Sequence, residues 1–288
     1  SKTLVYCSEG SPSSFNPQIV TDGTSINAGG IPLFNRLVEF EYGKTNVIPA
    51  LAESWKISKD NLTYTFKLRK GVKFHSNKDF TPTRDLTADD VVWSFERMSK
   101  KDHPYNLVGG GTYEYFDSME MGKLVKSFRA IDPLTIEIVL NAPESPFLAN
   151  LAMPFMGVLS KEYGDFLASK NRKAEIDSAP IGTGPFVLLS YQKDATIRYG
   201  AFEKYWGPRG NIDKLIFAIT PDANVRTQKL KAGECQFIAE PAPADLPALK
   251  SADAKSHFNV MQAAGLNVGF LAMNVTKKVI LAEQLSKN

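Results

Sequence analysis

Residues 62–75 read LTYTFKLRKGVKFH, and the first seven of them alternate strictly between apolar and polar side chains. Because successive side chains of an extended chain point to opposite faces, the alternation predicts a β-strand with one buried face. That face would consist of Leu62, Tyr64, Phe66 and Leu68. Residues 134–140 repeat the pattern. Two such strands are typical of a sheet with one face in water.

A helix signal follows at residues 86–95, which read LTADDVVWSF. Thr87 precedes Asp89 and Asp90, and acidic residues favour a helix start because they interact well with its positive N-terminal end. This position accounts for the acidic pair, so we assign it no catalytic role. Further strands are predicted at 3–7, 186–191, 196–201 and 215–220, and further helices at 146–151 and from Asp222 to Gly233. Strands and helices in no strict βαβ order indicate an α/β fold with mixed sheets.

Composition narrows the class of protein. The chain has 288 residues, 43% of them apolar, which is enough for a substantial core and favours two domains. The net charge is only +3, which argues against a nucleic-acid partner. The densest basic group alternates with apolar residues and is interpreted as the solvated side of a strand. It consists of Lys67, Arg69, Lys70 and Lys73.

The hydropathy pattern bears on the compartment. No apolar run approaches the roughly 18 to 20 residues that a membrane-spanning helix needs. The first six residues pass straight into a strand-like pattern and contain no signal peptide. We therefore expect a protein that is either cytosolic or already processed.

The sequence offers no catalytic or metal-binding constellation. A nucleophilic hydrolase needs a nucleophile, a base and an orienting acid, and the G-x-S-x-G elbow is missing. The three histidines, His75, His103 and His257, have no partner at H-x-x-x-H spacing, so no metal site is expected. His75 follows Phe74 at a predicted strand end, where a surface or half-buried position is expected. The pattern favours a binding protein.

Two glycine-rich segments interrupt the regular elements. Residues 108–112 read VGGGT, and residues 179–186 read APIGTGPF. Both are predicted places for the chain to cross between domains, because Gly and Pro break helices and strands. The first segment lacks the Lys and Ser/Thr of a phosphate-binding loop and the third Gly of a dinucleotide fingerprint. It is either a flexible turn or a binding-cleft loop whose backbone N–H groups meet ligand carbonyls.

Two cysteines, Cys7 and Cys235, lie far apart, and neither has a second Cys or His at metal-ligand spacing. A zinc site is therefore not expected. Each is either a small buried hydrophobic residue or half of a disulfide, which would require an oxidising compartment.

Several stretches, taken together, resemble the periplasmic peptide-binding family of ABC importers, solute-binding protein family 5. They are FNRLVEF at 34–40, PALAESW at 49–55, the two stretches quoted at 62–75 and 86–95, and GTGPF at 182–186. Supporting stretches are VYCSEG at 5–10, GTYEYF at 111–116 and GLNVG at 265–269. The resemblance covers residues 1 to about 278 and is greatest to the dipeptide-binding members and their haem- and glutathione-binding relatives.

The resemblance implies a periplasmic-binding-protein type II fold with mixed sheets and the family's extra lobe. Residues 1–36 would start lobe I, 37–183 would form the extra lobe, lobe II, and 184–278 would return to lobe I, while 279–288 stays unassigned. The match fades after Lys278, so the other ligand-binding lobe is expected to be absent and the chain incomplete. Relatives carry a disulfide where Cys7 and Cys235 fall. The compartment would be the periplasm of a Gram-negative bacterium, with the signal segment already removed.

The function implied is capture rather than chemistry, so neither an enzyme activity nor a cofactor is expected. Receptors of this family hold a short peptide between lobes, close on it by a hinge and deliver it to the membrane permease of an ABC importer. By matched position, one wall of the cleft would consist of Gly23, Thr24, Ser25, Gly111, Tyr113, Asn267 and Gly269. The Asp and Arg that pair with the ligand's charged ends would lie outside this chain, which is therefore expected to bind free peptide weakly or not at all.

Haem, glutathione or a nickel chelate is the alternative ligand within the same family. A secreted hydrolase and a module that binds unfolded chains are the alternatives from other classes. An incomplete lobe I would leave open sheet edges, which favour aggregation or a non-native oligomer.

Overall fold

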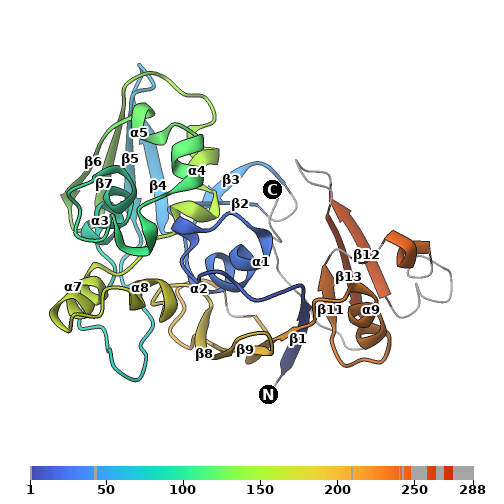
Figure 1. The fold of residues 1–288 in the computed structure, drawn as a ribbon. Coiled ribbons are helices and arrows are strands. Elements are labelled where there is room, and N and C mark those ends of the chain that lie inside the picture. Colours follow the sequence, from blue (N-terminus) through green and yellow to red (C-terminus); the bar gives the residue numbers. More distant parts are fainter. Residues whose placement is uncertain are drawn as a thin grey trace. The chain divides into compact units, whose positions relative to one another are not determined.

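The computed structural model describes residues 2–41, 44–208, 210–239, 241, 243–247, 258–263 and 269–274. The chain forms two compact units (Figure 1). Unit 1 comprises Ser1–Pro12, Phe186–Ala201 and Arg209–Asn288, and unit 2 comprises Ser13–Pro185 and Phe202–Pro208. Among the described residues, no helix is long and apolar enough to cross a membrane.

Unit 2 is built on an antiparallel sheet in the order β4-β5-β7-β6. Its strands are β4 (Ala52–Ile57), β5 (Thr63–Leu68), β6 (Val125–Asp132) and β7 (Thr135–Leu140). The alternation predicted from the sequence is confirmed, because Tyr64, Phe66 and Leu68 are buried while Lys67 is exposed. Phe66 lies opposite Ile136 of β7, which is also buried, so the two strands share one apolar face.

Helix α3 (Ala88–Ser99) packs on β6 and β7 and confirms the helix predicted from residues 86–95. It begins with a capping box, in which the side chains of Thr87 and Asp90 each accept a hydrogen bond from the other residue's backbone N–H. The two acidic residues of its first turn differ, since Asp89 is exposed and Asp90 is fully buried. Arg84 donates to both carboxylate oxygens of Asp90, at 2.8 and 2.9 Å.

The remaining elements of unit 2 are short. The helices and helical turns are η1 (Pro17–Ile19), α1 (Gly23–Ser25), η2 (Ile26–Gly30), α2 (Ile31–Leu33), η3 (Val108–Gly110), α4 (Glu114–Ser118), α5 (Met121–Leu124), α6 (Phe147–Leu151), η4 (Pro154–Met156), α7 (Lys161–Ser169) and α8 (Glu175–Ser178). Strands β2 (Val38–Phe40) and β3 (Val47–Pro49) form a small antiparallel pair.

Unit 1 is built on a mixed sheet in the order β12-β13-β11-β1-β10-β9-β8. Its strands are β1 (Thr3–Ser8), β8 (Phe186–Gln192), β9 (Thr196–Ala201), β10 (Lys214–Ile219), β11 (Phe237–Ala239), β12 (Phe258–Ala263) and β13 (Gly269–Asn274). Strand β1 runs parallel to β10 and β11, and the other pairs are antiparallel. Unit 1 also holds α9 (Ala223–Lys231) and the turn η5 (Pro243–Asp245). The mixed sheet of unit 1 agrees with the predicted α/β class with mixed sheets, whereas the sheets of unit 2 are antiparallel.

A disulfide joins Cys7 and Cys235, whose Cα atoms lie 5.9 Å apart. Both cysteines are buried with Leu230 of α9 and Ile238 of β11 in one apolar cluster. The implied pairing is therefore confirmed. The bond spans 228 residues, and in the chain-entropy model a loop of that size stabilises by about 5 kcal/mol.

His75 corrects a prediction, because it is fully buried rather than at the surface or half-buried. Its Nδ1 accepts a hydrogen bond from the Gly182 N–H at 3.3 Å, so its Nε2 carries the proton and donates to the Gly184 carbonyl at 2.9 Å. The ring also packs edge-on against Phe202 at 4.6 Å. Both ring nitrogens are hydrogen-bonded to backbone groups, which offsets the cost of removing them from water.

The two compact units divide the chain differently from the lobes that the family resemblance implies. Residues 13–36 group with unit 2, whereas the sequence prediction put them in lobe I, and residues 202–208 also belong to unit 2. Compactness is a property of this chain and does not define the family's lobes. The lobe boundaries at 36, 183 and 278 therefore stay predictions.

Candidate functional site

The structure places five of the seven predicted binding residues in unit 2 and one in unit 1. Gly23, Thr24, Ser25, Gly111 and Tyr113 belong to unit 2. Gly269 is the first residue of β13 in unit 1, where it pairs with Ala263 of β12. Asn267 lies outside the described residues. The ligand-binding role of all seven stays a prediction.

The first predicted loop forms the short helix α1. Asp22 precedes it, and its carboxylate accepts hydrogen bonds from the backbone N–H and the hydroxyl of Ser25, at 3.0 and 2.9 Å. The Ser25 hydroxyl oxygen also accepts from the Ser13 N–H at 2.9 Å, and the residue is fully buried. Gly23 and Thr24 are half-buried. The part of this loop that a ligand can reach is therefore Gly23 and Thr24.

The second predicted loop lies beside the first within unit 2. Tyr115 of α4 donates a hydrogen bond from its hydroxyl to the Thr21 carbonyl, at 3.1 Å. A Cβ atom placed on Gly109 would lie 3.3 Å from Cδ1 of Ile19. Two segments that are about 90 residues apart in the sequence are thus neighbours.

The second loop is a run of backbone in the left-handed region. Gly109, Gly110 and Gly111 have φ angles of +80°, +106° and +74°. Residues with a Cβ rarely adopt such angles, so this shape requires glycine. Gly109 and Gly110 are exposed, and they present nothing but backbone to solvent. The two roles that the sequence left open for this loop, a flexible turn and a binding-cleft loop, both stay predictions.

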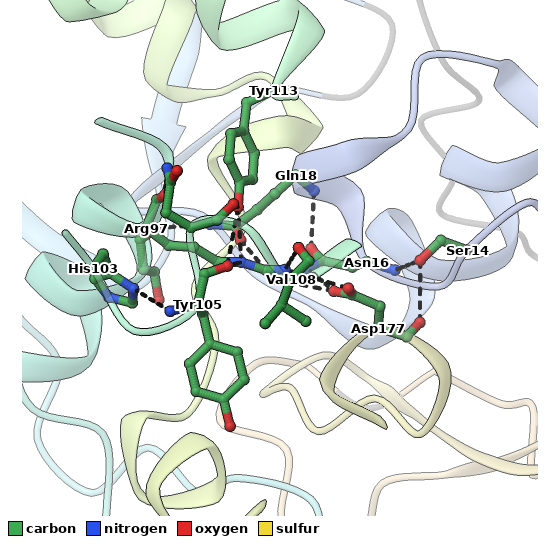
Figure 2. A network of polar contacts seen from close by, with 11 residues as sticks. Ser14, Asn16, Gln18, Arg97, His103, Tyr105, Val108, Tyr113 and Asp177 are labelled. Atoms are coloured by element: carbon green, nitrogen blue, oxygen red, sulfur yellow. Dashed lines mark hydrogen bonds and ion pairs between the residues drawn. The ribbon is translucent and has the colours of Figure 1, made fainter. Parts of the chain in front are cut away.

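A fully buried arginine, Arg97, contacts Gln18, which precedes the first loop, and Val108, which begins the second (Figure 2). Arg97 of α3 forms a fork with Asp177 of α8, with Nη1–Oδ1 at 3.0 Å and Nη2–Oδ2 at 3.3 Å. The same carboxylate accepts from the Asn16 side-chain amide at 2.6 Å. Arg97 Nη1 also donates to Gln18 Oε1 at 3.3 Å. The charged pair thus holds the segment that leads into the first loop.

Arg97 holds the second loop by three further contacts. Its Nε donates to the Tyr105 carbonyl and to the Tyr113 hydroxyl, both at 3.1 Å, and its Nη2 donates to the Val108 carbonyl at 2.9 Å. The Tyr113 hydroxyl donates in turn to the Asn106 carbonyl at 2.7 Å. Tyr113 is buried, with 1% of its surface exposed. The Tyr113 hydroxyl is therefore occupied by hydrogen bonds inside the protein.

The three titratable side chains beside the Arg97–Asp177 pair, Tyr113, Tyr105 and His103, are uncharged near neutral pH. Burial raises the pKa of the Tyr113 phenol, against an opposing effect of the Arg97 charge. Burial also raises the pKa of Tyr105 to about 12. Burial, and then the charge of Arg97, lower the pKa of His103 to about 4. Both phenols stay protonated and the imidazole stays neutral, so none of them adds a charge beside the pair.

Sequence reasoning missed this polar cluster, although α3 carries a signal for it. Asp90, Ser94 and Arg97 lie at positions i, i+4 and i+7, which places them on one face of the helix. A polar face on an amphipathic helix normally meets water. Here all three residues are buried, and Ser94 also donates to the Asp90 carbonyl and accepts from the Leu159 N–H. Each of them also has a partner far away in the sequence, namely Lys161, Leu159 and Asp177, so the pattern alone could not tell burial from exposure.

The chain belongs to the bacterial extracellular solute-binding proteins, family 5, whose middle-region model matches residues 46–284. It is 54% identical over 96% of its length to the dipeptide-binding protein of Escherichia coli K12, and 48% identical over 96% to heme-binding protein A of Haemophilus influenzae. Its structure superposes with a TM-score of 0.87 and 38% identity on the dipeptide-binding protein of Pseudoalteromonas sp. SM9913 in complex with Met-Leu, covering 92% of this chain.

These matches confirm the resemblance inferred from the sequence and the type II periplasmic-binding-protein fold. The chain spans about half the length of the relatives it matches, with 51% of the Escherichia coli protein, 50% of the Haemophilus protein and 52% of the Pseudoalteromonas chain covered. The family consists of solute-binding proteins.

Proposed function

We propose that this protein captures short peptides, above all dipeptides, and delivers them to the membrane permease of an ABC importer without chemical change. The observation that carries the proposal is the 54% identity to a dipeptide-binding protein along 96% of the chain. The receptor would work in the periplasm of a Gram-negative bacterium and would need no cofactor. Catalysis is no part of this proposal, because the relatives bind solutes.

The geometry of the second loop supports a peptide ligand. Gly109 and Gly110 expose backbone alone, and backbone pairs with the main chain of a peptide whatever its side chains are. A polar group that leaves water must regain a hydrogen bond, so such pairing holds a peptide without selecting its sequence. In this proposal Gly111 and Gly23–Ser25 of unit 2 contribute to the binding wall, and the same role for Asn267 and Gly269 stays a prediction from the family resemblance.

A hybrid receptor tests the proposal. In the hybrid, this chain replaces the matching half of the Escherichia coli dipeptide-binding protein, with which it shares 54% identity. Titration calorimetry with Ala-Ala, Met-Leu and free alanine would be compared between the hybrid and its parent. We expect both dipeptides to bind the hybrid within about tenfold of the parent's affinity, and alanine to give no signal. A folded hybrid that gives no heat with either dipeptide would refute the proposal.

Haem is the second candidate ligand, favoured by the 48% identity to heme-binding protein A. The same hybrid would be titrated with hemin and followed by the Soret band, with reduced glutathione as a further competitor. We expect an excess of dipeptide to prevent any hemin binding to the cleft. A stoichiometric Soret shift that dipeptide does not reverse would replace the peptide proposal by haem capture.

A further inference from the structure

Arg97 is a cation with no exposed surface, and its hydrogen-bonding groups join parts of unit 2 that are distant in sequence. Its guanidinium contacts Gln18, the backbone around the second loop and Asp177 of α8 (Figure 2). A buried charge persists only where its partners are in place, because an unpaired one is costly to desolvate. The geometry of these segments and the burial of Arg97 therefore depend on each other.

The loop is held from the side that faces Arg97 and is open on the other. On the inner side, Arg97 binds the Val108 carbonyl, and Asn106 donates its side-chain amide to the Arg97 carbonyl at 2.8 Å. Gly109 lies so close to the carboxylate that a Cβ atom there would sit 2.6 Å from Asp177 Oδ2. On the outer side, Gly110 has no atom within 4 Å of where its Cβ would be, and Leu107 is 77% exposed.

We propose that the Arg97–Asp177 pair positions the Leu107–Gly111 backbone for ligand binding, and that Tyr113 acts through Arg97 rather than by touching the ligand. The identity of the ligand, a peptide main chain, rests on the proposed function. A loop of three glycines has more conformational freedom to lose than any other, and that loss opposes binding. The buried pair orders the loop before the ligand arrives, which removes this cost from the binding step.

The chemistry of the pair explains why arginine is needed. The planar guanidinium donates in fixed directions and reaches Asp177, Tyr105 and Val108 at the same time. A lysine at position 97 would keep the positive charge but offer a single ammonium group. One nitrogen cannot take the places of Nε, Nη1 and Nη2 together, so some of the contacts to Asp177, Tyr105 and Val108 would be lost while the charge is kept. Arg97→Lys therefore separates loop positioning from charge neutralisation.

The test compares Arg97→Lys with Arg84→Lys, a matched control. Arg84 also contacts both oxygens of a buried carboxylate of unit 2, that of Asp90, and its remaining hydrogen bond goes to the Asp85 carbonyl rather than to the loop. Hydrogen–deuterium exchange of this chain would report on the amides of residues 105–113 and, as an internal reference, on β5. Loss of one or two hydrogen bonds to a charged group should raise loop exchange by at least about tenfold in Arg97→Lys. In Arg84→Lys, loop exchange should stay within about twofold.

The same two substitutions in the hybrid receptor give the ligand readout. We expect dipeptide affinity to fall by about tenfold for Arg97→Lys and to change less than about twofold for Arg84→Lys. Tyr113→Phe removes one hydroxyl and keeps the ring, and it should speed loop exchange by a few-fold, so it serves if Arg97→Lys does not fold. Loop exchange and dipeptide affinity that are unchanged in a folded Arg97→Lys protein would overturn the inference. A hybrid without any dipeptide binding would instead overturn the proposed function, while loop exchange still decides the positioning role.

Discussion

The two glycine-rich segments look alike in the sequence but need glycine for different reasons. Gly109–Gly111 has three consecutive positive φ angles, so its backbone shape excludes other residues. In residues 179–186, neither glycine has a positive φ in the structure, and the constraint is space. A Cβ on Gly182 would lie 2.0 Å from the Leu33 carbonyl oxygen, and one on Gly184 would lie 2.5 Å from the Leu33 carbonyl carbon.

The segments also differ in what surrounds them. Gly182 and Gly184 are buried and hydrogen-bonded to His75, and Thr183 donates to Asn35 at 2.8 Å. We call the contacts of Gly182, Thr183 and Gly184 with His75 and Asn35 the His75 clamp. The chain leaves unit 2 directly after this clamp, at Pro185, which confirms the predicted crossing there. No crossing occurs at Gly109–Gly111, so the same prediction was wrong for that segment. Glycine thus serves both in a buried segment where the chain passes between units and in an exposed backbone surface. Glycine in a sequence marks a constraint without saying which one.

The largest effect is expected from Gly182→Ala. The new methyl group would meet backbone atoms of Leu33, which cannot rotate away as a side chain can. Overpacking against backbone should lower the free energy of unfolding by about 3 kcal/mol or more. Urea unfolding measures this, with Gly10→Ala as the control, since a Cβ on Gly10 meets nothing within 4 Å. Equal midpoints for the two variants would contradict the spatial explanation.

The next largest effect is the pH dependence of the stability that the His75 clamp contributes. Burial lowers the pKa of His75 from 6.5 to about 4. Because the unfolded chain takes up the proton more readily, the stability contributed by neutral His75 is complete above pH 6.5 and is lost as the pH falls towards 4. The total loss should be about 3 kcal/mol. Urea unfolding from pH 7.5 to 4 should show a shallower decline in His75→Gln than in the unsubstituted chain, and parallel curves would refute the assignment.

The smallest effect on stability is expected from substituting an exposed glycine, and comparing two such glycines separates backbone strain from a role in binding. Gly110→Ala and Gly71→Ala both place a methyl group in open space at a positive φ, +106° and +80°. Each should cost about 1–2 kcal/mol of stability, because the strain is that of the backbone alone. In the hybrid receptor, we expect Gly110→Ala to weaken dipeptide binding and Gly71→Ala to leave it unchanged. Equal affinities for the two variants would argue against a ligand-binding role of the loop.

Periodicity predicted the regular elements well. The strands at 62–68 and 134–140, the helix after Thr87 and the helix after Asp222 are all present, with ends shifted by one to four residues. Burial follows local pattern there, since every second residue of β5 meets the core. His75 and Arg97 were beyond such reasoning. Both are polar residues whose burial depends on partners contributed by segments about 80 to 110 residues away.

The sequence by itself determined the family, the class of fold and six of the strands, namely β1, β5, β7, β8, β9 and β10. These follow from short-range periodicity and from ordered motifs such as residues 62–75 and 182–186. Tertiary structure decided which polar residues are buried and why each glycine is needed. Alternation and helical spacing are local properties of a chain, whereas the desolvation of Arg97 and the close approach of Gly182 to Leu33 exist only once distant segments have packed together.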